Sequence, residues 1–184
     1  MRLLDVDELG THLDCYRQRL FRMETLPAYA VSADGDDYHR WVAGEREPTW
    51  ERKQPWLDVL RADRVARKIR YRVRILSKEL TDYERYACEW GYALNAEAGE
   101  DIRVLRRGEH DIPSGIIERD FWVVDDDQVV AMHYDKHGQF EGAEPLPWSY
   151  SGMYRNTRDV AWAAGEPFGP WWARHPELHR YVAA

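Results

Sequence analysis

The chain has 184 residues, of which 44% are hydrophobic and 32% are charged, as in ordinary globular domains. Its formal net charge of −7 argues against direct nucleic-acid binding, which requires a positively charged surface. Nine tryptophans and eleven tyrosines predict a core rich in aromatic rings, with some rings left for a surface.

Two further features of the composition concern the location of the protein. No apolar run approaches the ~18 residues of a membrane span, and acidic residues near the N-terminus interrupt any signal-peptide core. Cys15 and Cys88 form no CxxC motif, so we expect two free, buried thiols in a reducing compartment. These observations favour a cytoplasmic protein without a membrane partner.

The first third of the chain is predicted to be mainly helical. Helical spacing of apolar residues predicts a helix over residues 5–22, followed by a short extended piece at 23–25. Asp34 is a candidate helix N-cap, and a short helix is expected over 37–43, ending at Gly44. Pro55 suits the first turn of a helix that runs to about Lys68.

Residues 69–105 predict a strand–helix–strand unit. Apolar and arginine side chains alternate over 69–76, which is typical of a strand. Thr81 and Glu84 form a T-x-x-E capping box, and an apolar stripe at helical spacing follows as far as Leu94. A short strand at 102–105 completes a parallel crossover, whose connection should be right-handed.

The second half of the chain predicts a hairpin and C-terminal helices. Strands are expected at about 118–125 and 128–134, with a third near 139–144, and helices at about 150–164 and 169–182. The fold class is therefore mixed α/β, with a central mixed sheet flanked by N- and C-terminal helices. We expect one domain over 1–184, in which residues 1–50 are a possible helical arm on an α/β core at about 51–184.

The segment 118–125 carries the acidic pattern Glu118-x-Asp120-x4-Asp125. In an extended strand, Glu118 and Asp120 share one face with Trp122. If this strand lies beside the strand at 69–76, its acids would pair with the arginines across the sheet. Alternatively, the arginine face binds a phosphate or carboxylate ligand. The candidate ligand-binding residues are Arg72, Arg74, Asp120, Trp122 and Tyr134.

No catalytic or metal-binding motif is evident in the sequence. His175 and His179 have a spacing that suits zinc on a helix, but Pro176 and the absence of HExxH argue against a metal site. Asp125, Asp126 and Asp127 are expected to be solvated turn acids. We expect no catalytic residues, no metal and no cofactor.

The C-terminal run PFGPWW at 167–172 combines prolines, glycine and three large rings. Phe168, Trp171 and Trp172 are candidates for a partner-docking surface, because tryptophan is enriched at interface hot spots. The alternative is a tail that closes over the core and packs through the same rings.

Several runs of this chain resemble a known family. They are LTDYERY at 80–86, EAGEDIR at 97–103, DFWVVDD at 120–126, HYD at 133–135, the turn at Gly138 and PFGPW at 167–171. These runs resemble an actinobacterial family of domains of unknown function, often encoded beside XRE-type helix-turn-helix regulators and their small partner proteins. The resemblance covers about residues 20–180 and implies no activity.

A further likeness is to phospholipase D-like domains. It rests on the strand–helix–strand order and on Glu118-x-Asp120-x4-Asp125, which stands where such enzymes carry H-x-K-x4-D. Both the His and the Lys positions are acidic here, so a phospholipase D-like half would lack its nucleophile.

The leading functional hypothesis is a non-enzymatic cytoplasmic accessory protein. It would act as an interaction or ligand-sensing partner of a transcription regulator of the helix-turn-helix type, as the family resemblance implies. One alternative is a hydrolase or phosphodiesterase-like enzyme, with Arg72, Arg74, Asp120 and Tyr134 lining a pocket. A second alternative is a toxin–antitoxin-like module. The sequence leaves the oligomeric state open.

Overall fold

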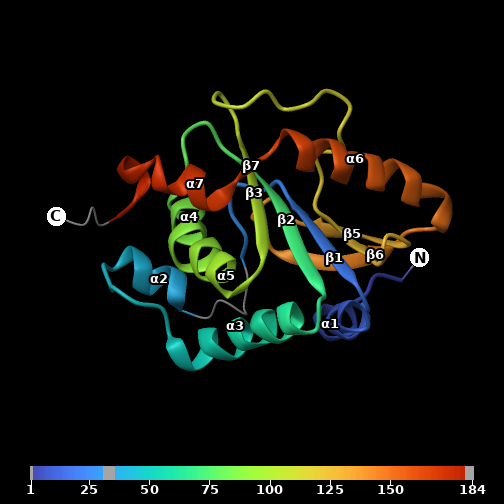
Figure 1. Ribbon diagram of the computed structural model, residues 1–184, viewed down its shortest axis with the longest axis horizontal. Coiled ribbons are helices and arrows are strands. Elements are labelled where there is room, and N and C mark those ends of the chain that lie inside the picture. Colours follow the sequence, from blue (N-terminus) through green and yellow to red (C-terminus); the bar gives the residue numbers. More distant parts are fainter. Residues whose placement is uncertain (1, 31–35, 181–184) are drawn as a thin grey trace.

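A mixed sheet in the order β6-β5-β4-β1-β2-β3-β7 forms the centre of the molecule (Figure 1). The computed structural model describes residues 2–30 and 36–180, and the sheet has seven strands within these ranges. β1, β2 and β3 run parallel to one another, while the other neighbours are antiparallel. The strands are β1 (Arg19–Glu24), β2 (Ile69–Leu76), β3 (Asp101–Arg106), β4 (Phe121–Val124), β5 (Gln128–Tyr134), β6 (Phe140–Pro145) and β7 (Glu166–Pro167). The predicted mixed α/β class is confirmed.

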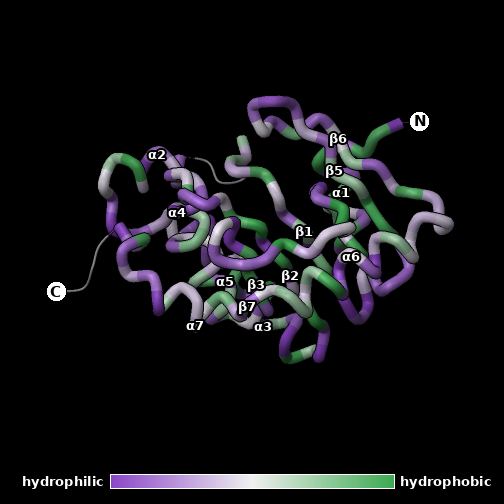
Figure 2. Tube along the Cα trace, turned by 90° about the horizontal axis from the view of Figure 1, so that it is seen from above, coloured by the Kyte–Doolittle hydropathy of each residue, from purple (hydrophilic) through white to green (hydrophobic). Residues whose placement is uncertain are grey.

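Helices cover both faces of this sheet (Figure 1). On one face, α6 packs its Tyr154 and Ala161 against Phe21, Val73 and Phe121 of the strands. The opposite face carries α3 and the helical run α4–η2–α5. Figure 2 shows hydrophobic segments along the central strands and hydrophilic ones along the outer loops. The helices are α1 (Val6–Asp14), α2 (Asp37–Val42), α3 (Trp50–Val65), α4 (Asp82–Tyr86), the π-helix η2 (Ala87–Tyr92), α5 (Ala93–Ala98), the 3₁₀ turn η3 (Trp148–Tyr150), α6 (Ser151–Ala164), α7 (Phe168–Ala173) and the 3₁₀ turn η4 (Pro176–Leu178).

The N-terminal part of the chain differs most from the prediction. The helix expected over 5–22 ends at Asp14, and Arg19–Glu24 form β1, which lies between β2 and β4. A run of four buried residues, 20–23, covers both faces of this strand. Over so short a run, the spacing of apolar residues in a helix is hard to tell from that in a strand buried on both faces. Residues 19–24 therefore belong to the sheet and not to a helical arm.

Other boundaries follow from prolines and caps. The crossover helix begins at Thr81 with the predicted capping box, and Gly99 ends it with a φ of 117°. α3 begins after Thr49, so Pro55 lies inside the helix and its placement in the first turn was wrong. The helix expected over 169–182 stops at Ala173, and a separate 3₁₀ turn starts at Pro176, because proline restricts the residue before it. Asp34 lies outside the described residues.

The core is aromatic, as its composition predicts. The largest fully buried side chains include those of Trp171, Phe21, Phe121 and Phe168. Cys88 is buried, and burial raises the pKa of its thiol, whereas Cys15 is exposed, contrary to the expectation.

Candidate functional site

Three arginines on β1 and β2 project from the face of the sheet opposite α6. Arg22 lies opposite Arg72 in the parallel register of β1 and β2, and Arg74 follows two residues later on the same face. Arg22 is 4% exposed and Arg74 is fully buried. Buried guanidinium groups need compensating charges, because an unpaired buried charge is very costly.

Carboxylates from four segments of the chain supply that compensation. Glu24 comes from β1 itself, Glu84 from α4, Glu100 from the loop before β3, and Asp120 from the residue before β4. The ion pairs are Arg22–Asp120 (2.8 Å), Arg22–Glu24 (3.7 Å), Arg72–Glu24 (3.0 Å), Arg72–Glu100 (2.7 Å) and Arg74–Glu84 (3.6 Å). We call Arg22, Arg72, Arg74 and these four acids the arginine layer.

The acids of segment 118–125 are not paired as the cross-strand hypothesis required. β1 separates β4 from β2, so Asp120 reaches Arg22 and not Arg72 or Arg74. Glu118 precedes the strand and pairs with Arg107 near the surface. Asp125 lies in the β4–β5 turn, yet it accepts hydrogen bonds from the backbone N–H groups of residues 17, 18 and 19. These N–H groups lower the pKa of Asp125 despite the opposing effect of burial, so this acid orders the chain that enters β1.

Tyrosine hydroxyls complete the arginine layer. Tyr29 Oη donates to Asp120 Oδ2 over 2.7 Å and accepts from Arg74 Nη1 over 3.2 Å. Burial raises the pKa of Tyr29 well above its ordinary value, so the phenol keeps its proton. Tyr92 Oη donates to Glu24 Oε2 over 2.8 Å. Burial would raise the pKa of Glu24, but the guanidinium groups of Arg72 and Arg22 outweigh burial and hold this pKa at about 2.

A cavity of about 600 Å³ lies above the arginine layer. This volume falls in the range of small-molecule sites in proteins, about 300–1,000 Å³. Its charged floor consists of Arg22, Glu24 and Arg72. Its walls are largely aromatic and include Tyr29, Trp56, Tyr83, Tyr86, Trp90, Tyr92, Trp122 and Tyr134. Asp37, Arg52, Lys53 and Asn95 add polar groups to the lining.

One wall of the cavity is built by an irregular helix. Residues 82–98 form one helical run, and Ala87–Tyr92 within it are a π-helix. Ala87, Trp90, Gly91 and Tyr92 of this π-segment all line the cavity. π-Helical turns are rare and occur frequently at functional sites. The π-segment is thus a second indication, besides the size of the cavity, that the cavity is a functional site.

Two buried donors of the cavity lining lack acceptors. Arg22 Nη1 and Trp122 Nε1 are inaccessible to solvent and have no hydrogen-bond partner among the described residues. The two side chains are neighbours, since Arg22 lies opposite Trp122 across β1 and β4, with its guanidinium 4.9 Å from the ring centroid. A buried donor without an acceptor costs about 1–3 kcal/mol, so these two groups are a local cost to the stability of the fold.

The sequence-predicted ligand residues are only partly brought together. Arg72, Trp122 and Tyr134 line the cavity, whereas Arg74 and Asp120 lie in the arginine layer and are not part of the lining. The sequence prediction missed Arg22, Glu24 and most of the aromatic wall. Treating residues 19–24 as a strand would have placed Arg22 and Glu24 on one face, next to the arginines of β2.

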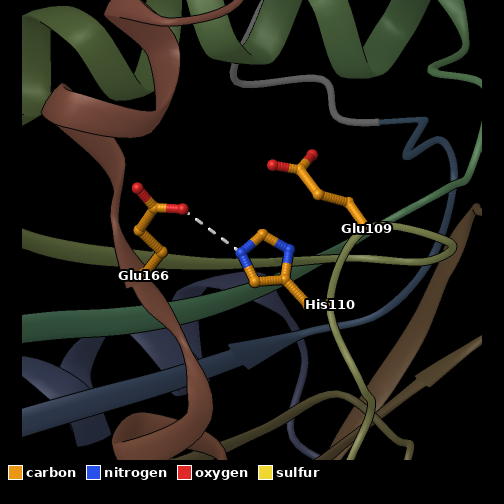
Figure 3. Close-up of side chains that lie close together, drawn as sticks. All are labelled: Glu109, His110 and Glu166. Atoms are coloured by element: carbon orange, nitrogen blue, oxygen red, sulfur yellow. Dashed lines mark hydrogen bonds and ion pairs between the residues drawn. The ribbon is translucent and has the colours of Figure 1, made fainter.

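A second polar cluster lies at the β3–β7 edge of the molecule, where Figure 3 shows His110 with Glu109 and Glu166. The backbone N–H of Arg106 donates to His110 Nδ1 over 3.0 Å. The neutral imidazole therefore carries its proton on Nε2, which faces Glu166 Oε2 at 3.3 Å. Arg174 pairs with both glutamates, and its hydrogen bond lowers the pKa of Glu166. We interpret the cluster as an ion-pair network, because neither imidazole nitrogen offers a lone pair for a metal.

The C-terminal rings and histidines have structural contacts. Phe168 and Trp171 are 2% and 0% exposed and pack with η2, α5 and the strands, while Trp172 is partly buried on the same cluster. His175 and His179 bond the backbone carbonyls of Trp171 and Trp172. The burial of two of the three rings favours the closing-tail interpretation over a docking surface made of these rings.

Fold and site together define a mixed α/β domain with a ligand-sized cavity on a buried ionic layer. None of the described helices combines the length and apolar character that crossing a bilayer requires. The chain belongs to the family described as "Domain of unknown function (DUF6879)", whose model matches residues 7–173. No curated protein matches the sequence.

Proposed function

We propose that this protein binds a small organic ligand in the cavity above the arginine layer, without catalysing a reaction on it. The observation that carries the proposal is the cavity of about 600 Å³, whose lining combines aromatic walls with the charged residues Arg22, Glu24 and Arg72. Aromatic walls supply apolar contact, and a few convergent polar groups supply orientation, which is the usual composition of a small-molecule site.

The chemistry of the lining supports binding over catalysis. The described residues that line the cavity include no histidine, serine or cysteine, so the histidine nucleophile of phospholipase D-like chemistry has no candidate there. A general base works best with a pKa near the working pH, whereas the pKa of Glu24 is about 2. Asp120 is saturated by Arg22, Tyr29 and the N–H and hydroxyl of Thr25.

A cavity-filling variant tests ligand binding. Gly91 lines the cavity, and a Cβ at this position would meet no atom within 4 Å, so Gly91→Leu should fill space without a clash. Gly152 on α6 is exposed and equally unobstructed, which makes Gly152→Leu the matched control. Thermal unfolding of wild type and both variants would be measured with a library of aromatic fragments.

The proposal expects fragments that stabilise the wild type and Gly152→Leu but not Gly91→Leu. At 100 times its Kd a ligand adds about 2.7 kcal/mol, or roughly 5–11 °C in Tm for a chain of this size. Fragments that stabilise Gly91→Leu as much as the wild type, or a library without any stabilising fragment, would reject the cavity as a binding site.

We further propose that the ligand-bound state is recognised by a transcription regulator of the helix-turn-helix type. This part rests on the family resemblance of the runs at 80–86, 97–103 and 120–126. The test is co-expression with a helix-turn-helix protein encoded beside the gene, followed by size-exclusion chromatography. Co-elution as a defined complex is expected, and separate elution of two folded proteins would contradict this part of the proposal.

A further inference from the structure

Arginine side chains lie over most of the rings that line the cavity. A guanidinium group within about 6 Å of a ring centroid is attracted by the negatively charged face of the ring. Five of the eight lining rings have such an arginine, and we call them the arginine-paired rings. The pairs, with the distance from the guanidinium carbon to the ring centroid, are Arg22–Trp122 (4.9 Å), Arg70–Trp56 (5.1 Å), Arg72–Tyr92 (5.3 Å), Arg74–Tyr29 (5.4 Å) and Arg180–Trp90 (5.5 Å).

The acids of the lining are also engaged within the protein. Among the described lining residues, the acids are Glu24 and Asp37. Glu24 pairs with Arg72 at 3.0 Å. Asp37 accepts from the N–H and the hydroxyl of Thr49 over 3.0 and 2.6 Å, and it lies 3.7 Å from Arg40. A cationic ligand would therefore compete with the protein's own arginines for both carboxylates.

The arginine-paired rings decide which charge a ligand can carry. A cation that enters an aromatic cavity loses its hydration, and this cost is normally offset by ring faces and carboxylates. A guanidinium on the cavity side of a ring occupies the face that a ligand cation would need. A guanidinium on the far side already polarises the ring and repels a second cation. The disadvantage to a cation is thus the same whichever face of the ring points into the cavity.

A flat ring without a positive charge meets no such obstacle. It has no ionic hydration to lose, and it gains from burial and from offset or edge contacts with the wall. The remaining lining rings, Tyr83, Tyr86 and Tyr134, make tilted or edge contacts of this kind with other rings of the protein.

We propose that the ligand is a planar aromatic ring system without a positive charge, and that the arginine-paired rings exclude cations of the same shape. This inference rests on the proposed function, because it names the ligand class of the same cavity.

Matched rings of equal size test the exclusion of cations. Isothermal titration calorimetry would compare methylpyridine, methylquinoline and methylisoquinoline, in mildly alkaline buffer where they are neutral, with N-methylpyridinium, N-methylquinolinium and N-methylisoquinolinium. At least one neutral ring should bind, and its cation should bind about 10-fold more weakly or less. A cation that binds as tightly as its neutral partner, or the failure of every neutral ring to bind, would overturn the proposal.

Substitutions test whether the arginines cause the exclusion. Arg180→Gln and Arg70→Gln remove the cation over Trp90 and over Trp56, respectively. Each should strengthen binding of the cations by about 2–5-fold and leave binding of the neutral rings unchanged.

Arg103→Gln is the matched control, because Arg103 lies 4.6 Å from the ring centroid of Trp162, which is not among the described lining residues. It should bind both kinds of ring like the wild type. Arg70→Gln leaves Asp63 without its partner at 2.6 Å. If that variant does not fold, Arg180→Gln alone decides, and unchanged cation binding in it contradicts the proposal.

The two proposals fail differently. If aromatic fragments bind in a Gly91-dependent manner but cations bind as tightly as neutral rings, the ligand class is wrong while the cavity remains a binding site. If no aromatic fragment binds, both proposals fall.

Discussion

Arg22 connects the buried charges of this protein to its cavity. Its Nη2 donates to Asp120 and to Tyr134 Oη, its Nε faces Glu24, and its plane lies over Trp122. Burial lowers the pKa of Arg22, but electrostatic interactions with the Tyr134 hydroxyl and the Asp120 carboxylate raise it more, so the guanidinium keeps its proton. The layer therefore depends on Glu24 staying ionised, because its protonation would leave the buried Arg22 and Arg72 without one of their partners.

Stability should therefore depend on the ionisation of Glu24. Its pKa is about 2 in the folded protein and about 4.5 without perturbation, so its contribution is complete above pH 4.5 and is lost as the pH falls to 2. Urea unfolding of the wild type should lose up to roughly 3 kcal/mol over this window through Glu24 alone. Glu24→Gln should show a shallower slope, and Glu141→Gln, at an exposed glutamate on β6, should follow the wild type. Parallel slopes for Glu24→Gln and the wild type would contradict the assigned ionisation.

At the scale of elements, the helical run at 82–98 combines a predictable start with an unpredictable middle. The capping box of Thr81 and Glu84 forms as expected. The π-helix that follows has more residues per turn than an α-helix, which rotates the later side chains about the helix axis. Tyr92 is therefore buried on the same side of the helix as Tyr83 and Tyr86. Simple 3.6-residue spacing cannot anticipate this change of phase, which is what brings Tyr92 to Glu24.

The cap also joins this helix to the chain that leaves β1. Thr81 Oγ1 accepts from the N–H of Glu84 over 3.1 Å and donates to the carbonyl of Pro27 over 2.7 Å. Thr81→Val removes both bonds at nearly constant volume and should cost about 1–2 kcal/mol in the free energy of urea unfolding. Thr81→Ser retains the hydroxyl and should lose less than half of that. Equal losses in the two variants would show that the hydroxyl contributes nothing.

At the scale of the whole molecule, the segment after β1 closes the arginine layer from one side. Tyr29 reaches Asp120 and Arg74, and the backbone of Ala30 bonds the turn between β5 and β6 at Gly138. Gly138 has a φ of 78°, and a Cβ there would lie 2.5 Å from the carbonyl oxygen of Ala28. The packing of the segment after β1 over the arginine layer thus depends on a glycine that is far from β1 in sequence.

Substitution of this glycine should loosen the closure. Gly138→Ala combines backbone strain with a backbone clash, whereas Gly115→Ala, at a φ of 86° with no neighbour within 4 Å, has the strain alone. Gly138→Ala should lose about 1–3 kcal/mol more in the free energy of unfolding than Gly115→Ala. Quenching of tyrosine and tryptophan fluorescence by acrylamide should also increase only in Gly138→Ala. Similar behaviour of the two variants would mean that the contact with Ala28 is not important for stability.

Local patterns were sufficient for several features of this protein. The alternation over 69–76, the capping box at Thr81 and the helix at 151–164 depend on near neighbours in the chain, and they form where the pattern places them. Composition likewise predicted the aromatic core. Arg72, Trp122 and Tyr134, which the sequence suggests as candidate ligand residues, lie in the lining of the cavity.

The order of the strands required the tertiary structure. β1 lies between β2 and β4, so Asp120 contacts Arg22 of β1 and not the arginines of β2. Glu118 lies near the surface and pairs with Arg107. A short segment such as 19–24 has helix-compatible and strand-compatible spacing, and only burial against β2 and β4 selects the strand. Contacts between residues far apart in the sequence decide which strands are neighbours in a sheet. The cavity and the buried donors beside it could therefore be found only from the tertiary structure.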